Sequence, residues 1–153
     1  MGHEYTQEEG EKRITNLEVG DKFITNWRMV NGAAVDEWNI LFGLTHPLFF
    51  SDEYAQKMGF ERRIVSGIFT FTFLFTGLGQ TGLLRDGIYL GTDKLRYPTP
   101  VYAGDMLRAE MEVLSKRRTS KGDRVVIRYK WLGRNQHQEV VAEGENTCMF
   151  PTP

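Results

Sequence analysis

The sequence predicts an α+β domain in which one long helix packs on an antiparallel sheet. Helical patterns dominate residues 31–84, whereas residues 88–150 contain several runs in which apolar and polar residues alternate. A period of two is typical of strands with one buried face, and helices followed by several strands indicate a mixed α+β domain. The 153 residues contain no internal repeat, low-complexity tract or long linker, which predicts a single domain.

The composition is that of an ordinary folded protein, with 41% hydrophobic and 25% charged residues. A net charge of -1 provides no overall field that would attract nucleic acid or an anionic membrane, so we expect neither as a partner. The single cysteine, Cys148, cannot form an internal disulfide, which suits a reducing cytoplasm. Residues 1–13 are polar and charged and lack the apolar centre of a signal peptide.

The first 60 residues predict an arm, a strand and two helices. Residues 1–15 are expected to form a mobile or loosely docked arm ahead of a domain over residues 16–153. Residues 21–30 predict a short strand, and residues 31–42 a helix capped by Asn31, with Trp38, Leu41 and Phe42 on its buried face. A second, short helix is expected to begin at Asp52, whose side chain can cap it.

Residues 66–84 allow two interpretations. The alternation Phe69-Thr70-Phe71-Thr72-Phe73 favours a strand, whereas the length of the uncharged run favours a buried helix. Ser66 and Gly67 suit the start of a helix, and Gly82 could end it. The uncharged run over residues 64–84 is long enough to raise the question of a membrane span, but its serine, glutamine, threonines and glycines favour burial in a protein core.

The second half predicts a series of strands. The first covers residues 88–97 and is interrupted by Pro98 and Pro100. The next covers residues 106–115, with Leu107, Ala109, Met111 and Val113 on one face. Val125, Ile127, Tyr129 and Trp131 repeat the pattern, residues 133–136 predict a hairpin loop, and residues 139–150 return as the last strand.

Three segments resemble the MaoC-like, or R-specific enoyl-CoA hydratase, family. Residues 43–55, Gly-Leu-Thr-His-Pro-Leu-Phe-Phe-Ser-Asp-Glu-Tyr-Ala, are similar to its pattern Gly-Asp-x-Asn-Pro-Leu-His-x-Asp-x-Glu-Tyr-Ala. Residues 60–67, Phe-Glu-Arg-Arg-Ile-Val-Ser-Gly, are similar to Phe-Gly-Gly-Arg-Ile-Ala-His-Gly. Residues 96–105, Arg-Tyr-Pro-Thr-Pro-Val-Tyr-Ala-Gly-Asp, are similar to Arg-Phe-x-x-Pro-Val-x-x-Gly-Asp.

The resemblance implies a single hotdog domain, in which an antiparallel sheet wraps around a long central helix. It implies a hydro-lyase of fatty acid metabolism that acts on 2-enoyl or 3-hydroxyacyl thioesters. The coenzyme A or acyl carrier would then be part of the substrate, and no separate cofactor is expected. It also implies a homodimer, with pairing to a catalytic paralogue as a further alternative.

The chain departs from the family at the positions that carry the chemistry. In the family the aspartate activates water and the histidine exchanges a proton with the substrate, but Leu44 and Phe49 stand at these two positions. Neither side chain can hold a proton. His46 stands where the family usually has asparagine, and Ser66 where another histidine is common. Gly67 matches the glycine whose N–H, at the start of the central helix, faces the thioester carbonyl.

The remaining polar residues of these segments give two sets of candidates. His46 and Asp52 are the candidate catalytic groups, although His46 could be structural and Asp52 could serve the start of a helix. Arg62 and Arg63 could bind a nucleotide phosphate or belong to an ordinary charged loop. The expected substrate-binding residues are Gly67, Ser66, Phe49 and Leu44. The three histidines and single cysteine lack metal-ligand spacing, so no metal is expected.

Two functions remain open at this point. The first is a hydratase or dehydratase in which His46, Asp52 or another group performs the proton transfers. The second is a non-catalytic subunit that binds an acyl thioester of coenzyme A or an acyl carrier, or that serves as a structural part of a hydratase complex.

Overall fold

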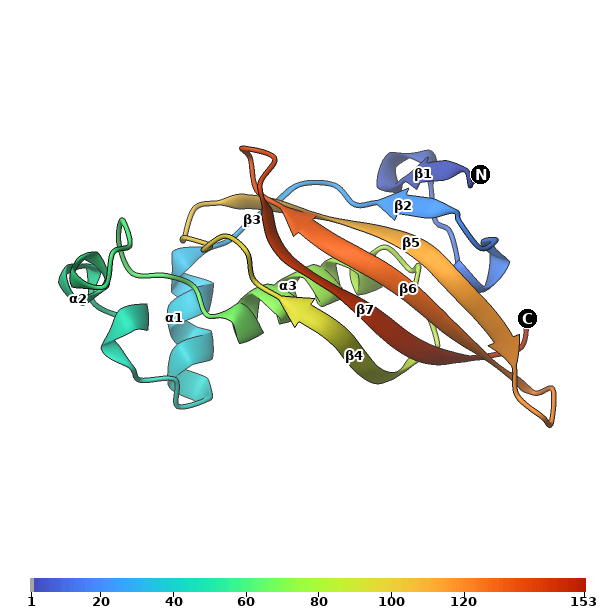
Figure 1. The fold of residues 1–153 in the computed structure, drawn as a ribbon. Helices are drawn as coiled ribbons and strands as arrows, with labels where there is room; N and C mark the ends of the chain where they lie inside the picture. The colour runs from blue at the N-terminus through green and yellow to red at the C-terminus, as the bar shows by residue number, and fades with distance from the viewer. Residues whose placement is uncertain (1) are drawn as a thin grey trace.

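The computed structural model describes residues 2–153, and Met1, the first residue of the expected arm, lies outside them. Its elements are shown in Figure 1. In chain order they are β1 (Glu4–Thr6), η1 (Gln7–Glu9), η2 (Ile14–Asn16), β2 (Lys22–Ile24), β3 (Arg28–Met29), α1 (Gly32–Leu41), η3 (Pro47–Phe49), α2 (Asp52–Lys57), α3 (Gly67–Gln80), β4 (Ile88–Arg96), β5 (Met106–Arg118), β6 (Arg124–Arg134) and β7 (Val140–Pro151).

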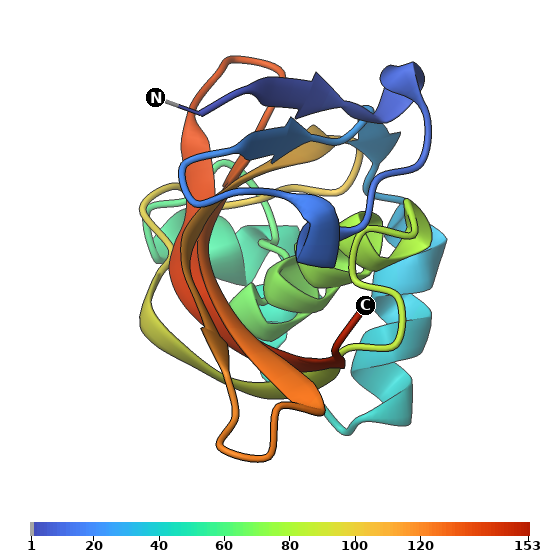
Figure 2. The ribbon, with the colours of Figure 1, turned by 90° about the vertical axis from the view of Figure 1, so that its right-hand side faces the viewer.

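The strands form one sheet in the order β1-β2-β5-β6-β7-β4, with β3 paired to β5 off this path. The long strands β5, β6, β7 and β4 are all antiparallel to their neighbours, whereas β1 joins β2 in parallel. The sheet curls around α3, which lies on its concave face (Figure 2). This arrangement confirms the predicted α+β class and the hotdog fold.

Residues 66–84, whose pattern allowed either a strand or a helix, contain the helix α3. The hydroxyls of Thr70, Thr72 and Thr76 each donate to a backbone carbonyl four residues earlier, at 2.8–3.2 Å, so these polar groups need no partner outside the helix. Ser66 caps the helix, since its Oγ accepts a hydrogen bond from the Phe69 N–H at 3.1 Å. The helix ends at Gln80, two residues before the glycine expected to end it. The period-two pattern is therefore overridden by burial in the curled sheet.

The core lies between α3 and the concave face of the sheet. The side chains predicted to face inward are buried, as expected from the alternation: Leu107, Ala109, Met111, Val113, Val125, Ile127, Tyr129 and Trp131. Helix and sheet approach closely at Gly133, where an added Cβ would lie 2.4 Å from Cδ1 of Leu74. A side chain at this position would therefore push the helix away from the sheet.

A buried polar cluster interrupts this apolar layer. The Oδ1 atom of Asn146 accepts hydrogen bonds from Trp131 Nε1 at 2.9 Å and from Thr92 Oγ1 at 2.6 Å. Its Nδ2 donates to the hydroxyl of Tyr129 at 3.0 Å. Asn146, Tyr129 and Trp131 are all buried, so one amide satisfies three polar groups that have little access to water.

Two predictions for the first half are wrong in detail. The strand expected over residues 21–30 is split into β2 and β3. Of the expected buried face, Trp38 is partly buried and packs against the core, but Leu41 is 76% exposed and Phe42 66% exposed. The fully buried residues of α1 are Val35 and Asn39. The expected buried face assumed that the apolar stripe of the helix meets the core. Instead α1 lies at one end of the sheet, as Figure 1 shows, so only a narrow stripe is covered.

The expected N-terminal arm contains a docked strand and a core residue. β1 pairs with β2, and Ile14 is fully buried. Asp21 holds this segment, because its two carboxylate oxygens accept hydrogen bonds from the N–H groups of Glu18 and His3, both at 2.8 Å. These two donors hold the pKa of Asp21 below its ordinary value.

Asp21 is therefore expected to make stability depend on acid pH. Its folded-state pKa is lowered, so its contribution is complete above the unfolded pKa of about 3.9 and is lost as the pH falls through the folded value. The substitution Asp21→Asn is expected to lower the free energy of unfolding at pH 7 by about 1 kcal/mol. It is also expected to make the free energy of unfolding depend less on pH in the acid range. Urea unfolding from pH 7 to pH 2 measures both, with Glu8→Gln as an exposed control. Equal slopes in wild type and Asp21→Asn would contradict this role.

Within residues 2–153, no helix has the length and apolar character that a membrane crossing requires.

Candidate functional site

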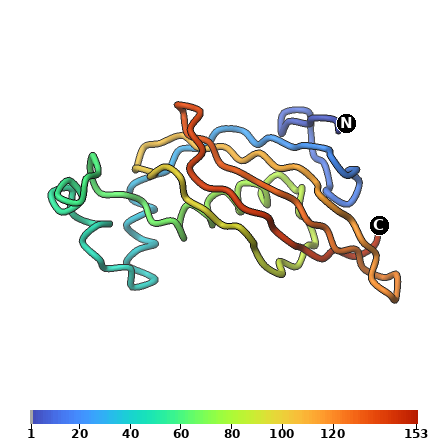
Figure 3. The backbone as a smooth tube through the Cα atoms, in the orientation of Figure 1, coloured from blue at the N-terminus to red at the C-terminus, as the bar shows by residue number. Residues whose placement is uncertain are grey.

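The residues that resemble a hydratase active site lie mainly in the segment 42–66, between α1 and α3. Figure 3 shows this segment at the end of the molecule opposite both termini. It contains the short helices η3 and α2, and a hydrogen bond from the Ile64 N–H to the Leu48 carbonyl at 3.3 Å joins η3 to the stretch that leads into α3. The segment therefore approaches the start of α3 through backbone contacts.

His46 caps η3 through its imidazole. Its Nδ1 accepts a hydrogen bond from the Leu48 N–H at 3.1 Å. The ring also makes edge-to-face contacts with Tyr54, at 5.4 Å between centroids, and with Phe49, at 6.2 Å. A neutral imidazole that accepts at Nδ1 carries its proton on Nε2, so His46 presents a donor to its surroundings.

Leu44 and Phe49, at the positions of the family's aspartate and histidine, are both half-buried. The Leu44 N–H donates to the Asn39 carbonyl at 2.8 Å, which ties the turn after α1 to that helix. The side chain of Asn39 is fully buried, and neither its Oδ1 nor its Nδ2 has a partner within residues 2–153. No sequence pattern marks Asn39 as a buried polar residue, because a single asparagine within a helix carries no periodic signal.

Asp52 and Arg63 are tied into one cluster. The Arg63 guanidinium binds both oxygens of Asp36, at 2.6 and 3.3 Å, and the Phe49 carbonyl at 3.4 Å. The hydrogen bond to Asp36 raises the pKa of Arg63 above its ordinary value. The backbone N–H of Arg63 donates to Oδ1 of Asp52 at 3.0 Å. The cluster joins α1, η3 and α2, so it holds the 42–66 segment in place.

Asp52 does not cap α2 with its side chain. The capping residue is Ser51, whose Oγ accepts a hydrogen bond from the Tyr54 N–H at 3.1 Å. The predicted capping residue was therefore placed one position too late in the chain. Serine and aspartate both favour the cap position, and Ser51 and Asp52 are adjacent.

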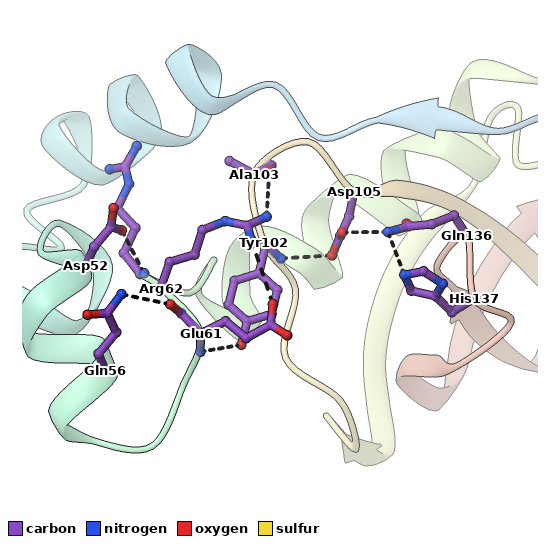
Figure 4. A network of polar contacts seen from close by, with 10 residues as sticks. Asp52, Gln56, Glu61, Arg62, Tyr102, Ala103, Asp105, Gln136 and His137 are labelled. Atoms are coloured by element: carbon purple, nitrogen blue, oxygen red, sulfur yellow. Dashed lines mark hydrogen bonds and ion pairs between the residues drawn. The ribbon is translucent and has the colours of Figure 1, made fainter.

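Arg62 has a different set of polar contacts, which Figure 4 draws together with Asp52. Its guanidinium packs over the Tyr102 ring at 4.6 Å, donates to the Ala103 carbonyl at 3.3 Å and lies 3.8 Å from the carboxylate of Glu61. The Glu61 N–H in turn donates to the Tyr102 hydroxyl at 3.3 Å. Arg62 and Arg63 therefore point to different partners, and Arg62 is the more exposed of the two.

Ser66 and Gly67 form the start of α3. The Ser66 Oγ accepts from the Phe69 N–H, and its carbonyl accepts from the Thr70 N–H at 3.0 Å. The N–H groups of Gly67 and Ile68 have no acceptor within residues 2–153, as expected for the first turn of a helix. These two donors lie at the positive end of the helix dipole, which favours an electron-rich oxygen such as a thioester carbonyl.

The structure therefore divides the candidate residues into three groups. His46 lies with Phe49, Asp52 lies with Arg63, and Ser66 lies with Gly67. No hydrogen bond in the described part of the chain joins His46 to Asp52. Cys148 is buried, and burial raises the pKa of its thiol to about 11, so it is protonated at neutral pH.

The comparisons with known proteins agree with this fold. The MaoC like domain matches residues 15–135, and the chain therefore belongs to the MaoC-like family.

Three relatives illustrate the match. The (R)-specific enoyl-CoA hydratase of Aeromonas caviae is 37% identical over 103 residues, which is 67% of this chain and 75% of that protein. Mesaconyl-CoA hydratase of Cereibacter sphaeroides is 31% identical over 114 residues, or 74% of this chain, but the match spans only 33% of that longer protein. A MaoC-like dehydratase from Rhodospirillum rubrum has a structure that superimposes with a TM-score of 0.80 at 28% identity, covering 93% of this chain and 99% of that one.

Proposed function

We propose that this chain acts on acyl thioesters of coenzyme A or of an acyl carrier, as a hydratase or dehydratase that works without the family's usual Asp–His pair. The observation that carries the proposal is the start of α3, where the N–H groups of Gly67 and Ile68 are available to a ligand carbonyl. Relatives named as CoA hydratases support thioesters as the substrate class. The proposal requires no cofactor other than the carrier of the acyl group.

Hydration of a 2-enoyl thioester places a hydroxyl on the β-carbon and a proton on the α-carbon. Negative charge builds up on the thioester oxygen as water adds. Donors that already point at this oxygen stabilise the charge without reorganising. Gly67 at the start of α3 supplies such a donor.

His46 and Asp52 can divide the proton transfers between them. The acid form of His46 is the imidazolium, which gives up the contact between Nδ1 and the Leu48 N–H and transfers its Nε2 proton to the α-carbon, leaving a neutral ring. Asp52 uses Oδ1 to accept the Arg63 N–H, which leaves Oδ2 to take a proton from water. In this proposal His46 is the acid and Asp52 is the base.

The second candidate function is thioester binding without turnover. Leu44 and Phe49 cannot transfer protons, and both His46 and Asp52 already make hydrogen bonds that stabilise local structure. Loss of one acid or base typically lowers the rate by ~10²–10⁴-fold. A subunit that retains Gly67 and the apolar side chains of Leu44 and Phe49 would still hold the acyl group.

Turnover and binding measured together distinguish these functions. The chain is mixed with 2-butenoyl-CoA to follow hydration, and with butanoyl-CoA to measure binding by calorimetry. Hydration that is lost in both His46→Ala and His46→Asn supports the enzyme, because asparagine retains an acceptor for the Leu48 N–H but cannot transfer a proton. Hydration lost only in His46→Ala assigns the residue a structural role. Binding without hydration supports the second function, and the absence of both overturns the two proposals.

The proposal includes a two-fold homodimer formed along β4. This strand lies at the edge of the sheet and pairs only with β7 among residues 2–153. The other side of its backbone therefore has no neighbouring strand to hydrogen-bond with. It carries the exposed apolar residues Ile88, Tyr89, Leu90 and Leu95. An edge of this kind is a template for pairing with a second strand, and pairing with its own copy would bury the same surface on both chains.

Leu90→Lys is expected to weaken this dimer at least about tenfold, because it places a charge on a surface that pairing would bury. Leu90 is 53% exposed in the single chain, so the substitution leaves the core intact. Sedimentation velocity across micromolar concentrations measures the dissociation constant, with Val19→Lys as an exposed apolar control far from β4. A wild-type chain that sediments as a monomer at these concentrations would contradict the dimer, and a heavier mixed species with a catalytic paralogue would replace it.

A cytoplasmic location completes the proposal. It is supported by the protonated, buried thiol of Cys148 and by the coenzyme A and carrier thioesters that the function requires.

A further inference from the structure

Tyr97, the residue after β4, lies directly against the first residue of α3. A Cβ atom built on Gly67 would be 2.8 Å from both Cε2 and Cζ of the Tyr97 ring and 3.0 Å from Cδ2. Real side chains essentially never approach so closely. The backbone of Gly67 does not have a positive φ, so glycine is not needed here for conformational reasons. It is needed because the tyrosine ring occupies the space of a side chain.

The end of β4 is shaped to bring Tyr97 to this place. The pairing of β4 with β7 shifts register between Asp93 and Arg96, and Lys94 has a φ of 55 within the irregularity. Bulges of this kind bend a strand and redirect the side chains that follow. Figure 1 shows the end of β4 beside the first turn of α3, in agreement with the contact at Gly67.

The contact places a hydroxyl group at the proposed carbonyl site. The Tyr97 hydroxyl is bonded to Cζ, one of the two ring atoms nearest to Gly67. It is therefore one bond away from a ring atom that contacts the first residue of α3. Tyr97 is 42% exposed, so a ligand can reach it, and partial burial raises the pKa of its hydroxyl. The group remains protonated at neutral pH and can donate a hydrogen bond.

We propose that the Tyr97 hydroxyl is a second hydrogen-bond donor to the thioester carbonyl, acting beside the N–H groups at the start of α3. The inference rests on the proposed function and adds a substrate-binding residue to it. No proton is transferred: the hydroxyl donates to the neutral carbonyl in the bound substrate and to the more negative oxygen as water adds. The family pattern described above has phenylalanine at this position, so the hydroxyl distinguishes this chain.

The test uses a thioester that the chain cannot convert. Butanoyl-CoA with a ¹³C-labelled carbonyl is bound to the wild type, Tyr97→Phe and Tyr5→Phe, and its affinity and carbonyl stretching frequency are measured by calorimetry and infrared difference spectroscopy. Tyr97→Phe keeps the ring on Gly67 and removes only the donor. We expect Tyr97→Phe to bind butanoyl-CoA about three- to tenfold more weakly than the wild type. We also expect its carbonyl stretching band at a higher frequency, because fewer hydrogen bonds polarise the carbonyl. Tyr5→Phe, which removes a hydroxyl from β1, is expected to match the wild type.

A second variant tests the contact itself. Gly67→Ala adds a methyl group where the ring lies, so it is expected to displace Tyr97 and to shift the carbonyl band in the same direction as Tyr97→Phe. Adding Tyr97→Phe to Gly67→Ala is then expected to cause little further shift. If wild type and Tyr97→Phe bind butanoyl-CoA equally with the same carbonyl band, the role of Tyr97 is overturned while the proposed function stands. If the wild type does not bind the thioester, both are overturned.

Discussion

The double substitution Leu44→Asp with Phe49→His is expected to raise the rate of 2-butenoyl-CoA hydration by at least ~10²-fold, and by up to ~10⁴-fold. These positions match the family's base and acid, and the N–H groups at the start of α3 have no acceptor within residues 2–153. The two side chains already lie in the half-buried part of the 42–66 segment. The gain follows if the missing proton carriers are the main defect of the site.

Controls separate this chemistry from changes in folding. Leu44→Asn with Phe49→His has nearly the same shape but lacks the base, so it should remain near the wild-type rate. A new carboxylate in a half-buried site is expected to lower the free energy of unfolding by roughly 1–3 kcal/mol, which urea unfolding measures. A double variant that folds and binds thioester but stays inactive would show that the pocket differs beyond these two residues. A fast wild type would disprove the premise that Leu44 and Phe49 mark lost chemistry.

Asn146→Leu is expected to lower the free energy of unfolding by about 2–4 kcal/mol. The substitution preserves side-chain volume approximately but removes the partner of Trp131 Nε1, Thr92 Oγ1 and the Tyr129 hydroxyl. A buried polar group that loses its partner costs about 1–3 kcal/mol, and at least two of these three lie in the core. Chemical denaturation at neutral pH measures the loss.

The neighbouring residue on β7 supplies the matched control. Thr147 lies on the opposite face of the strand and is half-buried, so Thr147→Ala is expected to change stability by less than about 0.5 kcal/mol. If Asn146→Leu is as stable as the wild type, the apolar side chain compensates for the lost hydrogen bonds and the polar cluster serves a purpose other than stability.

Local patterns predicted the elements of this fold wherever one face of an element meets the core. The alternation in β5 and β6 identified the buried residues, and Ser66 and Asn31 were placed as caps because capping depends on neighbours in sequence. The exposed face of α1 was not predictable in this way. Leu41 and Phe42 have the spacing of a core stripe, and only the position of the helix at the end of the sheet decides otherwise.

The site was harder to predict than the fold because its contacts join distant residues. The pairing of Arg63 with Asp36 and the packing of Tyr97 on Gly67 span 27 and 30 residues, and no periodicity carries such information. The docking of residues 4–6 also depends on a contact between distant residues, because Asp21 accepts a hydrogen bond from the backbone N–H of His3. By contrast, the family followed from short motifs whose spacing is local.

The alternating phenylalanines and threonines of α3 have a consequence for folding. The helical state of this segment depends on the sheet that surrounds it, since its own pattern is equally suited to a strand. During synthesis the segment emerges before β4–β7 exist, so for that interval an uncharged, β-prone stretch has nothing to enclose it. Such stretches are the ones that assemble between chains at high concentration. The yield of native protein is therefore expected to depend on how quickly the last four strands close, and to improve when expression is slowed or a chaperone shields the emerging chain.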